Sequence, residues 1–127
     1  MRMIGHGIDM AKVSGIKEEL DSPDMKWAER VCSHDEREQA DEPPMHYRYY
    51  AGRFAGKEAV AKALGTGFAG DVTWRGIEIL RCESGGPYIR LSGDVLAFAH
   101  SLGITGWFIS ITHCGEITMA SVIAMAD

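Results

Sequence analysis

The start of the chain alternates hydrophobic residues with small or polar ones in the segment MIGHGIDMAKV, which begins at Met3. On an extended strand, one face would carry Ile4, His6, Ile8 and Met10, and the other Met3, Gly5, Gly7 and Asp9. The second face combines two glycines with an acid, so we expect open space beside the Asp9 carboxylate. The pattern predicts an N-terminal strand that carries a candidate functional acid.

Three stretches that follow carry helix signals. Ser22-Pro23-Asp24 is typical of a helix start and precedes MKWAERVC. Residues 33–36 have the Ser-x-x-Glu form of a capping box, which predicts a second short helix. A long segment from Met45 to Leu64 contains no proline, and Gly65 is suited to cap its C-terminal end.

The second half of the chain is richer in strand patterns. WRGIEILRCE and YIRLSG flank a turn at residues 84–87 and predict a hairpin, and DVLAFAHSL over 94–102 predicts a helix that stops at Gly103. GWFISITH and ITMASVIAMA are apolar and β-branched, and the short HCGE segment joins them as a second hairpin. We therefore predict an α+β fold, with a mostly antiparallel sheet packed against one long helix and several short ones.

Composition limits the class of protein. The chain has 127 residues, enough for one domain over 1–127, and its hydrophobic content of 46% is that of a soluble globular protein. No apolar run approaches the roughly 20 residues of a membrane span, and the N-terminus lacks a signal-peptide core. Cys32, Cys82 and Cys114 are odd in number and unclustered, which favours free thiols and a cytoplasmic location. The net charge of −5 disfavours nonspecific nucleic-acid binding but permits a local basic pocket.

The segment AGRFAGKEAVAKALGTG, residues 51–67, places an acid inside an apolar helix. The helical neighbours of Glu58 are Ala51, Phe54, Ala55, Ala61 and Lys62. A Glu58–Lys62 pair on a solvated stripe would account for both charges. However, the helix is apolar on nearly every side, so we expect it to be buried on more than one face. A carboxylate at low dielectric needs a cation, and a metal is one way to supply it.

The helix is followed by ALGTGFAG, in which three glycines and a hydroxyl come just past its end. Such a loop allows backbone N–H groups to approach a phosphate closely. It is not a Walker loop, because it follows a helix and lacks the Gly-Lys-Ser/Thr sequence. A plain glycine cap explains the same residues equally well.

Several motifs occur in a fixed order along nearly the whole chain: GHGIDM, GRFAGKEAVAKALGTGFAG, GGPYIRL, SITH and MASVIA. This combination resembles the holo-(acyl-carrier-protein) synthases, the small bacterial 4′-phosphopantetheinyl transferases. The resemblance implies an enzyme that transfers the phosphopantetheine arm of coenzyme A to a serine hydroxyl of an acidic acyl carrier protein, releasing adenosine 3′,5′-bisphosphate. It implies Mg2+, with Mn2+ as an alternative, on the coenzyme A pyrophosphate. It further implies a homotrimer with active sites between subunits, in fatty-acid or secondary metabolism.

The resemblance also implies roles for individual residues. The metal ligands would be Asp9 and Glu58, and the catalytic residues Glu58, Lys62 and His113. The coenzyme A site would comprise Arg53, Lys62, Gly65, Thr66, Gly67, Gly86, Pro87 and His113. Each has an ordinary alternative: Asp9 as a turn cap, Arg53 as a solvated helix residue, His113 as a structural strand end. The serine proton would go to Glu58 directly or to a metal-bound water that it holds.

The chain departs from the family pattern where the carrier protein and a phosphate are contacted. The acid and the arginine that usually follow the first strand are replaced by Lys12 and Gly15, and the basic residue of the Gly-x-Pro turn by Gly86. Ile117 and Thr118 replace a tyrosine and an alanine. Positive charge near the first strand would come from Lys12, Lys17, Lys26 and Arg30. The competing interpretations are a non-catalytic coenzyme A or nucleotide-binding module and a ligand-free structural trimer.

Overall fold

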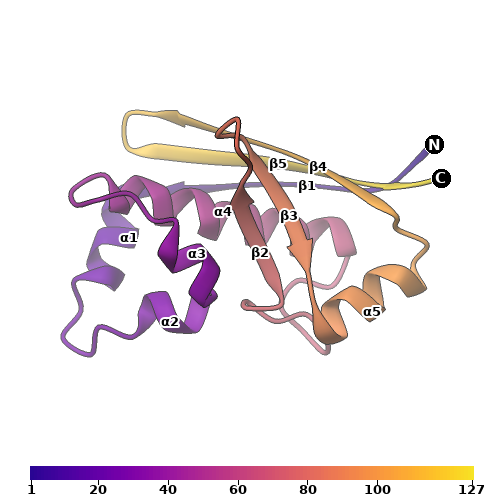
Figure 1. Cartoon of the computed structure of the whole chain (residues 1–127), viewed down its shortest axis with the longest axis horizontal. Helices are drawn as coiled ribbons and strands as arrows, with labels where there is room; N and C mark the ends of the chain where they lie inside the picture. The colour runs from indigo at the N-terminus through magenta and orange to yellow at the C-terminus, as the bar shows by residue number, and fades with distance from the viewer.

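Three long strands form a sheet, and the longest helix lies across one of its faces (Figure 1). The computed structural model describes all residues from 1 to 127. The strands are β1 (Arg2–Lys12), β2 (Ile77–Arg81), β3 (Pro87–Leu91), β4 (Gly106–Cys114) and β5 (Ile117–Ala126). The helices are α1 (Val13–Leu20), α2 (Trp27–Val31), α3 (His34–Glu38), α4 (His46–Leu64) and α5 (Gly93–Ser101). None of the five helices combines the length and apolarity that crossing a membrane requires.

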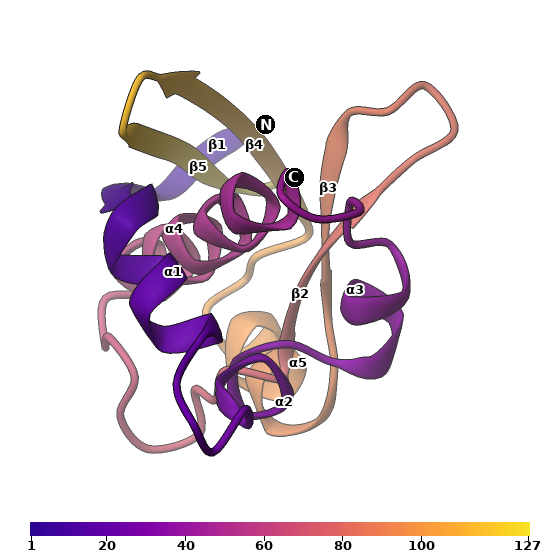
Figure 2. The same cartoon turned by 90° about the vertical axis from the view of Figure 1, so that its left-hand side faces the viewer.

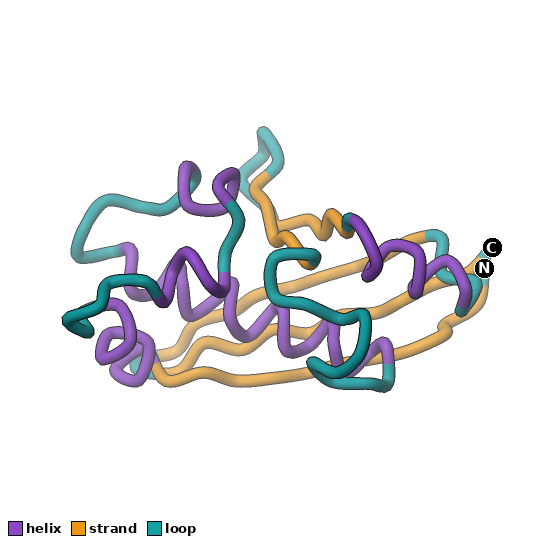
Figure 3. Tube along the Cα trace, turned by 90° about the horizontal axis from the view of Figure 1, so that it is seen from below, coloured by secondary structure: helices purple, strands orange, loops and turns teal.

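All the strand pairs are antiparallel, which confirms the predicted α+β class and both predicted hairpins. The three-stranded sheet has the order β1-β5-β4, and β2 with β3 forms a separate two-stranded sheet. Pairing of β1 with β5 brings the two termini together at one end of the molecule (Figure 1). Seen from below, α4 runs along the three long strands, so residues at its two ends face different parts of the sheet (Figure 3).

The space over Gly5 and Gly7 is filled by helix α4. A Cβ atom added to Gly7 would collide with the carbonyl oxygen of Ala59, and one added to Gly5 with the carbonyl oxygen of Ala63. The two glycines therefore leave no open face, whereas the expected space beside Asp9 is present as a cavity of about 200 Å³. The glycines serve a close contact between the α4 backbone and β1, and this contact brings Asp9 up to the helix.

Helix α4 is buried along most of its length, as the apolar segment predicts. Its small residues Ala51, Ala55 and Ala59 have no exposed surface, and β1, β2 and β5 all contact it. On its remaining side, Lys57 is fully buried and donates from Nζ to Glu36 Oε1 at 2.7 Å. Lys57 also donates to the carbonyl oxygens of Trp74, at 2.9 Å, and Ile77.

Two helix boundaries follow from local chemistry and one does not match the expectation. Ser33 and Glu36 form the predicted capping box at the start of α3, and Gly65 ends α4 with a φ of 84°. The helix predicted to start at Ser22-Pro23-Asp24 begins instead at Trp27. At the predicted start, Asp24 accepts hydrogen bonds from Ser22 Oγ and the Lys26 N–H, and these bonds hold a turn before the helix.

Helix α1 has no counterpart in the sequence prediction. It follows β1 without a loop, is only eight residues long, and has Ile16 as its one buried residue. Ser14 and Gly15 are poor helix formers and gave no helix signal. Contact with α4 and β1 holds this helix in place, as the view along the sheet shows (Figure 2).

The outer face of the three-stranded sheet is apolar and has no helix over it. Ile8, Met10 and Phe108 are 48%, 58% and 57% exposed. The strand register places Met119 beside Met10, and Ile123 beside Phe108, on this same face. Trp107, Ile109 and Ile111 of β4 alternate with these outer residues and pack against the core.

We predict that Gly7→Ala destabilises the protein by about 1–3 kcal/mol, because its methyl group must push α4 away from β1. Gly15→Ala is the matched control: no atom lies within 4 Å of the added Cβ, and alanine favours the α1 helix. Urea unfolding followed by tryptophan fluorescence measures both. A Gly7→Ala protein as stable as Gly15→Ala would contradict the close contact.

Candidate functional site

The two predicted metal-binding acids meet where α4 crosses β1. Asp9 lies on β1, and Glu58 and Lys62 lie one turn apart on α4. Lys62 Nζ donates to Asp9 Oδ1 and to the carbonyl oxygen of Ile8, both at 3.0 Å. Lys62 is thus paired with Asp9, and the simple Glu58–Lys62 pair considered from the sequence is not formed.

Glu58 is half-buried and its charge is poorly compensated. Burial raises the pKa of its carboxyl, and the negative charge of Asp9 raises this pKa further, against the opposing effect of Lys62. The two carboxylates are a donor set of hard oxygens, which suits Mg2+. The chain contains no group of three or more His, Cys, Asp or Glu side chains that could hold a metal ion. Magnesium sites of the substrate-bridging kind use only one or two carboxylates, so Asp9 and Glu58 fit the ion.

Two cavities are lined by Met10, and one of them also borders Asp9. One of about 200 Å³ is lined by Ile8, Asp9, Met10, Lys62 and Met119. Another of about 360 Å³ is lined by residues of β1, α1, α2 and α4, among them Gly15, Trp27 and Phe54. Asp9 and its partner Lys62 therefore border open volume.

A second, cationic cavity of about 160 Å³ lies between α4, the β2–β3 turn and β4. Its lining residues are Arg53, Arg81, Gly85, Pro87, Ile111 and His113. Arg53 is only 6% exposed and donates from Nε to the carbonyl oxygen of Ile79 at 3.1 Å. The Nη2 atom of Arg53 is buried without a hydrogen-bond partner. An unpaired buried donor is costly, and an anion in the cavity would satisfy it, so Arg53 is not the solvated helix residue considered from the sequence.

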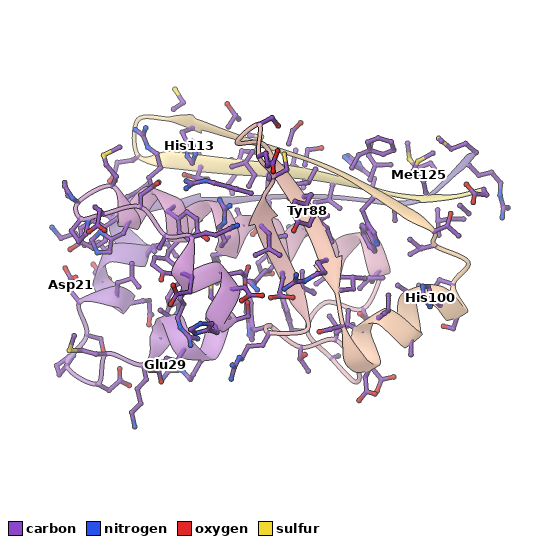
Figure 4. All side chains as sticks on the ribbon, viewed as in Figure 1. Asp21, Glu29, Tyr88, His100, His113 and Met125 are labelled. Atoms are coloured by element: carbon purple, nitrogen blue, oxygen red, sulfur yellow. The ribbon has the colours of Figure 1, made fainter.

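His113 forms the wall of this cavity on β4, near the β4–β5 turn and at the end of the sheet opposite Met125 (Figure 4). Its Nδ1 lies 2.8 Å from Oγ1 of Thr118, which fixes the ring. Partial burial lowers the pKa of His113, and the charges of Arg48 and Arg53 lower it further. The ring is therefore neutral near pH 7 and can take up a proton when an anion enters.

Arg81 is a cavity residue that sequence reasoning missed. It ends β2, and its guanidinium donates to both carboxylate oxygens of Asp41, at 3.0 and 2.9 Å. The signal was its position next to the Ser84–Pro87 turn, since a charged residue at a hairpin end can face the same cavity as the turn. The predicted turn residues are partly placed there: Gly85 and Pro87 line the cavity, and Gly86 lies between them in the chain.

The Gly65-Thr66-Gly67 loop lies elsewhere in the chain. Gly65 and Gly67 have φ of 84° and 61°, and Thr66 Oγ1 donates to the Gly67 carbonyl oxygen at 2.9 Å. Thr66 lines a cavity with residues 69–72 and Phe98, apart from the cationic cavity. Within one chain, the predicted site residues therefore fall into two groups: Asp9, Glu58 and Lys62 with the adjacent glycine loop, and Arg53 and His113 with the β2–β3 turn.

Comparison with known proteins assigns this arrangement to a family. A family model described as the 4′-phosphopantetheinyl transferase superfamily matches residues 5–112. The chain belongs to the 4′-phosphopantetheinyl transferase superfamily. A holo-[acyl-carrier-protein] synthase of Maridesulfovibrio salexigens is 42% identical over 125 residues, 97% of this chain and 98% of the relative. One of Natranaerobius thermophilus is 39% identical over 127 residues, 98% of this chain and 99% of the relative.

Solved structures of this transferase family share the fold. The holo-[acyl-carrier-protein] synthase of Neisseria meningitidis superimposes with a TM-score of 0.89 at 28% identity, covering 97% of this chain and 98% of that one. The synthase of Bacillus anthracis, in complex with CoA (3′,5′-ADP), superimposes with a TM-score of 0.83 at 29% identity over the full length of both chains. The chain is an enzyme of the holo-(acyl-carrier-protein) synthase type, as the sequence motifs predict.

Proposed function

We propose that the enzyme transfers the 4′-phosphopantetheine group of coenzyme A to a serine hydroxyl of an apo acyl carrier protein and releases adenosine 3′,5′-bisphosphate. The observation that carries this proposal is the cationic cavity with the unpaired, buried Arg53 Nη2, combined with a separate pair of acids. Related synthases from Bacillus anthracis and Helicobacter pylori have been solved with coenzyme A, which supports the choice of substrate.

The geometry suggests how the reaction is divided among the side chains. The serine oxygen attacks the pantetheine-side phosphorus, and the bond from that phosphorus to the bridging oxygen breaks, leaving adenosine 3′,5′-bisphosphate. Glu58, whose pKa is raised, accepts the serine proton directly or through a water, and Lys62 offers a point charge to the leaving phosphate. Mg2+ held by Asp9 and Glu58 would neutralise charge on the diphosphate. Arg53 and His113 bind a phosphate group of coenzyme A.

We propose further that the active site is completed between subunits of a homotrimer. The uncovered apolar sheet face around Ile8, Met10 and Phe108 supports burial against other copies. Glu58 and Lys62 do not line the Arg53 cavity within one chain, which is compatible with a site whose two halves come from different subunits.

The carrier protein that we propose as the partner is acidic. Exposed Lys12, Lys17, Lys26 and Arg30 supply positive charge around α1 and α2, where the family arginine is replaced by Gly15. Of these, Arg30 is partly engaged by Asp24, at 3.5 Å, and Lys17 lies 5.2 Å from the centre of the Tyr47 ring. All three cysteines are free, which is compatible with the cytoplasmic site of action that we propose.

We predict that Glu58→Gln lowers the rate of carrier modification by about 100-fold or more, because proton acceptance is lost and one hard-oxygen ligand is weakened. The measurement is the gain in mass of an apo carrier incubated with coenzyme A and Mg2+. Asp94→Asn, which removes an exposed acid of α5, is the control and should act as wild type. Binding of coenzyme A by the wild-type protein without transfer would instead favour a non-catalytic binding module.

We predict that two inactive variants restore activity when their subunits are mixed. Suppose that Arg53 and Glu58 of one site come from different subunits. In a mixed cyclic oligomer of Arg53→Ala and Glu58→Gln subunits, about a quarter of the active sites then contain both wild-type residues. The activity of dissociated and reassembled mixtures is compared with each variant reassembled alone. No recovery in mixtures that contain hybrid trimers would show that each site is built within one chain.

We predict that coenzyme A binds with uptake of a proton by His113. The free ring has a lowered pKa and is neutral, whereas a bound phosphate favours the charged ring, so affinity should rise as pH falls from about 8 to about 6. Calorimetry in buffers of different ionisation enthalpy counts the protons. His113→Gln corrects for protonation of the phosphate itself, and equal proton uptake in both proteins would exclude this role.

A further inference from the structure

The cationic cavity contains two guanidinium groups that repel each other. Arg53 and Arg81 both line it. Burial lowers the pKa of Arg53, and the charge of Arg81 lowers it further. Two like charges beside one small cavity are favourable for binding an anion but costly in its absence. Something in the fold must therefore hold both groups in place.

The group that both guanidiniums contact is the ring of Tyr49. The Arg53 guanidinium carbon lies 4.0 Å from the centre of this ring, and that of Arg81 lies 5.0 Å from it. The electron-rich face of an aromatic ring attracts cations, and more strongly where water is excluded. Tyr49 is only 3% exposed, so the ring is well placed to offset the repulsion between the two arginines.

Tyr49 is itself fixed in the frame of the protein. Its hydroxyl donates to the backbone carbonyl oxygen of Glu36 at 2.5 Å. The Glu36 carboxylate in turn accepts from Lys57 and from the N–H of Ile79, on the strand whose carbonyl oxygen receives Arg53 Nε. The ring thus belongs to the same rigid unit of α3, α4 and β2 that forms one wall of the cavity.

The other contacts of the two arginines differ. Arg53 bonds to the Ile79 carbonyl oxygen and leaves Nη2 unpaired, whereas Arg81 bonds to Asp41 and to the carbonyl oxygen of Gln39. Tyr49 therefore provides what these separate anchors do not, a common surface that sets the position of one guanidinium relative to the other.

We propose that Tyr49 is a positioning residue that holds Arg53 and Arg81 together as a two-arginine binding site for a phosphate group, and that Arg81 is a binding residue of this site. The identity of the phosphate as part of coenzyme A rests on the proposed function. The pairing of the two arginines by the ring does not. Arg81 also supplies, from the end of β2, positive charge that the β2–β3 turn lacks because Gly86 stands in it.

The experiment compares three variants of the assembled protein. Tyr49→Leu removes the ring, Tyr49→Phe keeps the ring and loses the hydroxyl, and Tyr50→Leu removes a neighbouring buried ring that packs on Trp27 and Tyr49 and contacts neither arginine. The affinities for coenzyme A and for inorganic pyrophosphate are measured by calorimetry, with oligomer mass and thermal stability recorded for each variant. Should Tyr49→Leu fail to fold, Tyr49→Met keeps apolar volume without an aromatic face.

We expect Tyr49→Leu to weaken binding of both ligands about tenfold, and Tyr49→Phe to stay within about twofold of wild type. In carrier modification, the KM for coenzyme A should rise by a similar factor, with kcat and the KM for the carrier unchanged. Tyr50→Leu should lose stability without losing affinity for either ligand.

Wild-type affinity in Tyr49→Leu, or an equal loss in Tyr50→Leu, would overturn the positioning role. Absence of pyrophosphate binding by the wild-type protein would also overturn it. If pyrophosphate binding depends on Tyr49 but coenzyme A neither binds nor is consumed, the positioning role stands and the proposed function fails.

Discussion

A lysine and a glutamate without any exposure to solvent join three elements of this protein. Lys57 of α4 bonds to the Glu36 carboxylate and to the carbonyl oxygens of Trp74 and Ile77, and Glu36 also accepts the N–H groups of Ser33 and Ile79. Removing one partner of such a pair typically costs about 3–5 kcal/mol, because the other charge is left buried alone. The pair therefore fixes α3 and the start of β2 against one side of α4.

The opposite side of α4 is held by close packing against β1 and β5, which glycines and alanines at the contact make possible. Gly5 and Gly7 allow the helix backbone to touch β1, and the fully buried alanines of α4 allow β5 to pack closely. A helix held on both sides positions its polar residues accurately in two directions. Glu58 and Lys62 point to β1 and Asp9, whereas Arg53 points to β2 and the cationic cavity.

This arrangement separates two kinds of chemistry along one helix. The acids gather where burial and mutual repulsion make a cation favourable, and the arginines gather where an unpaired donor makes an anion favourable. A substrate that carries a diphosphate and a second phosphate on a nucleotide would satisfy both regions. In the homotrimer that we propose, the uncovered face of the sheet would be buried between copies of the chain.

Much of the fold could be predicted from the sequence, because the signals are local. The capping box at Ser33, the glycine end of α4 and the alternation along β4 and β5 each depend on neighbouring residues alone. Helix α1 and the true start of α2 were missed, since α1 is held by contacts with α4 and β1, and Asp24 forms a turn rather than a cap.

The sequence by itself determined the family, and it predicted the acid pair and the histidine as site residues, because these residues occur in motifs of fixed order. It did not determine which lysine pairs with which acid. Lys57 and Lys62 both lie within one turn of Glu58, but Lys57 bonds to Glu36 and Lys62 to Asp9, both far away in the chain. Nor did it indicate that Arg81 lines the cationic cavity or that Tyr49 contacts both of its arginines. Those partnerships depend on distances between β2, α3 and α4, and only packing of these elements around a common core sets such distances.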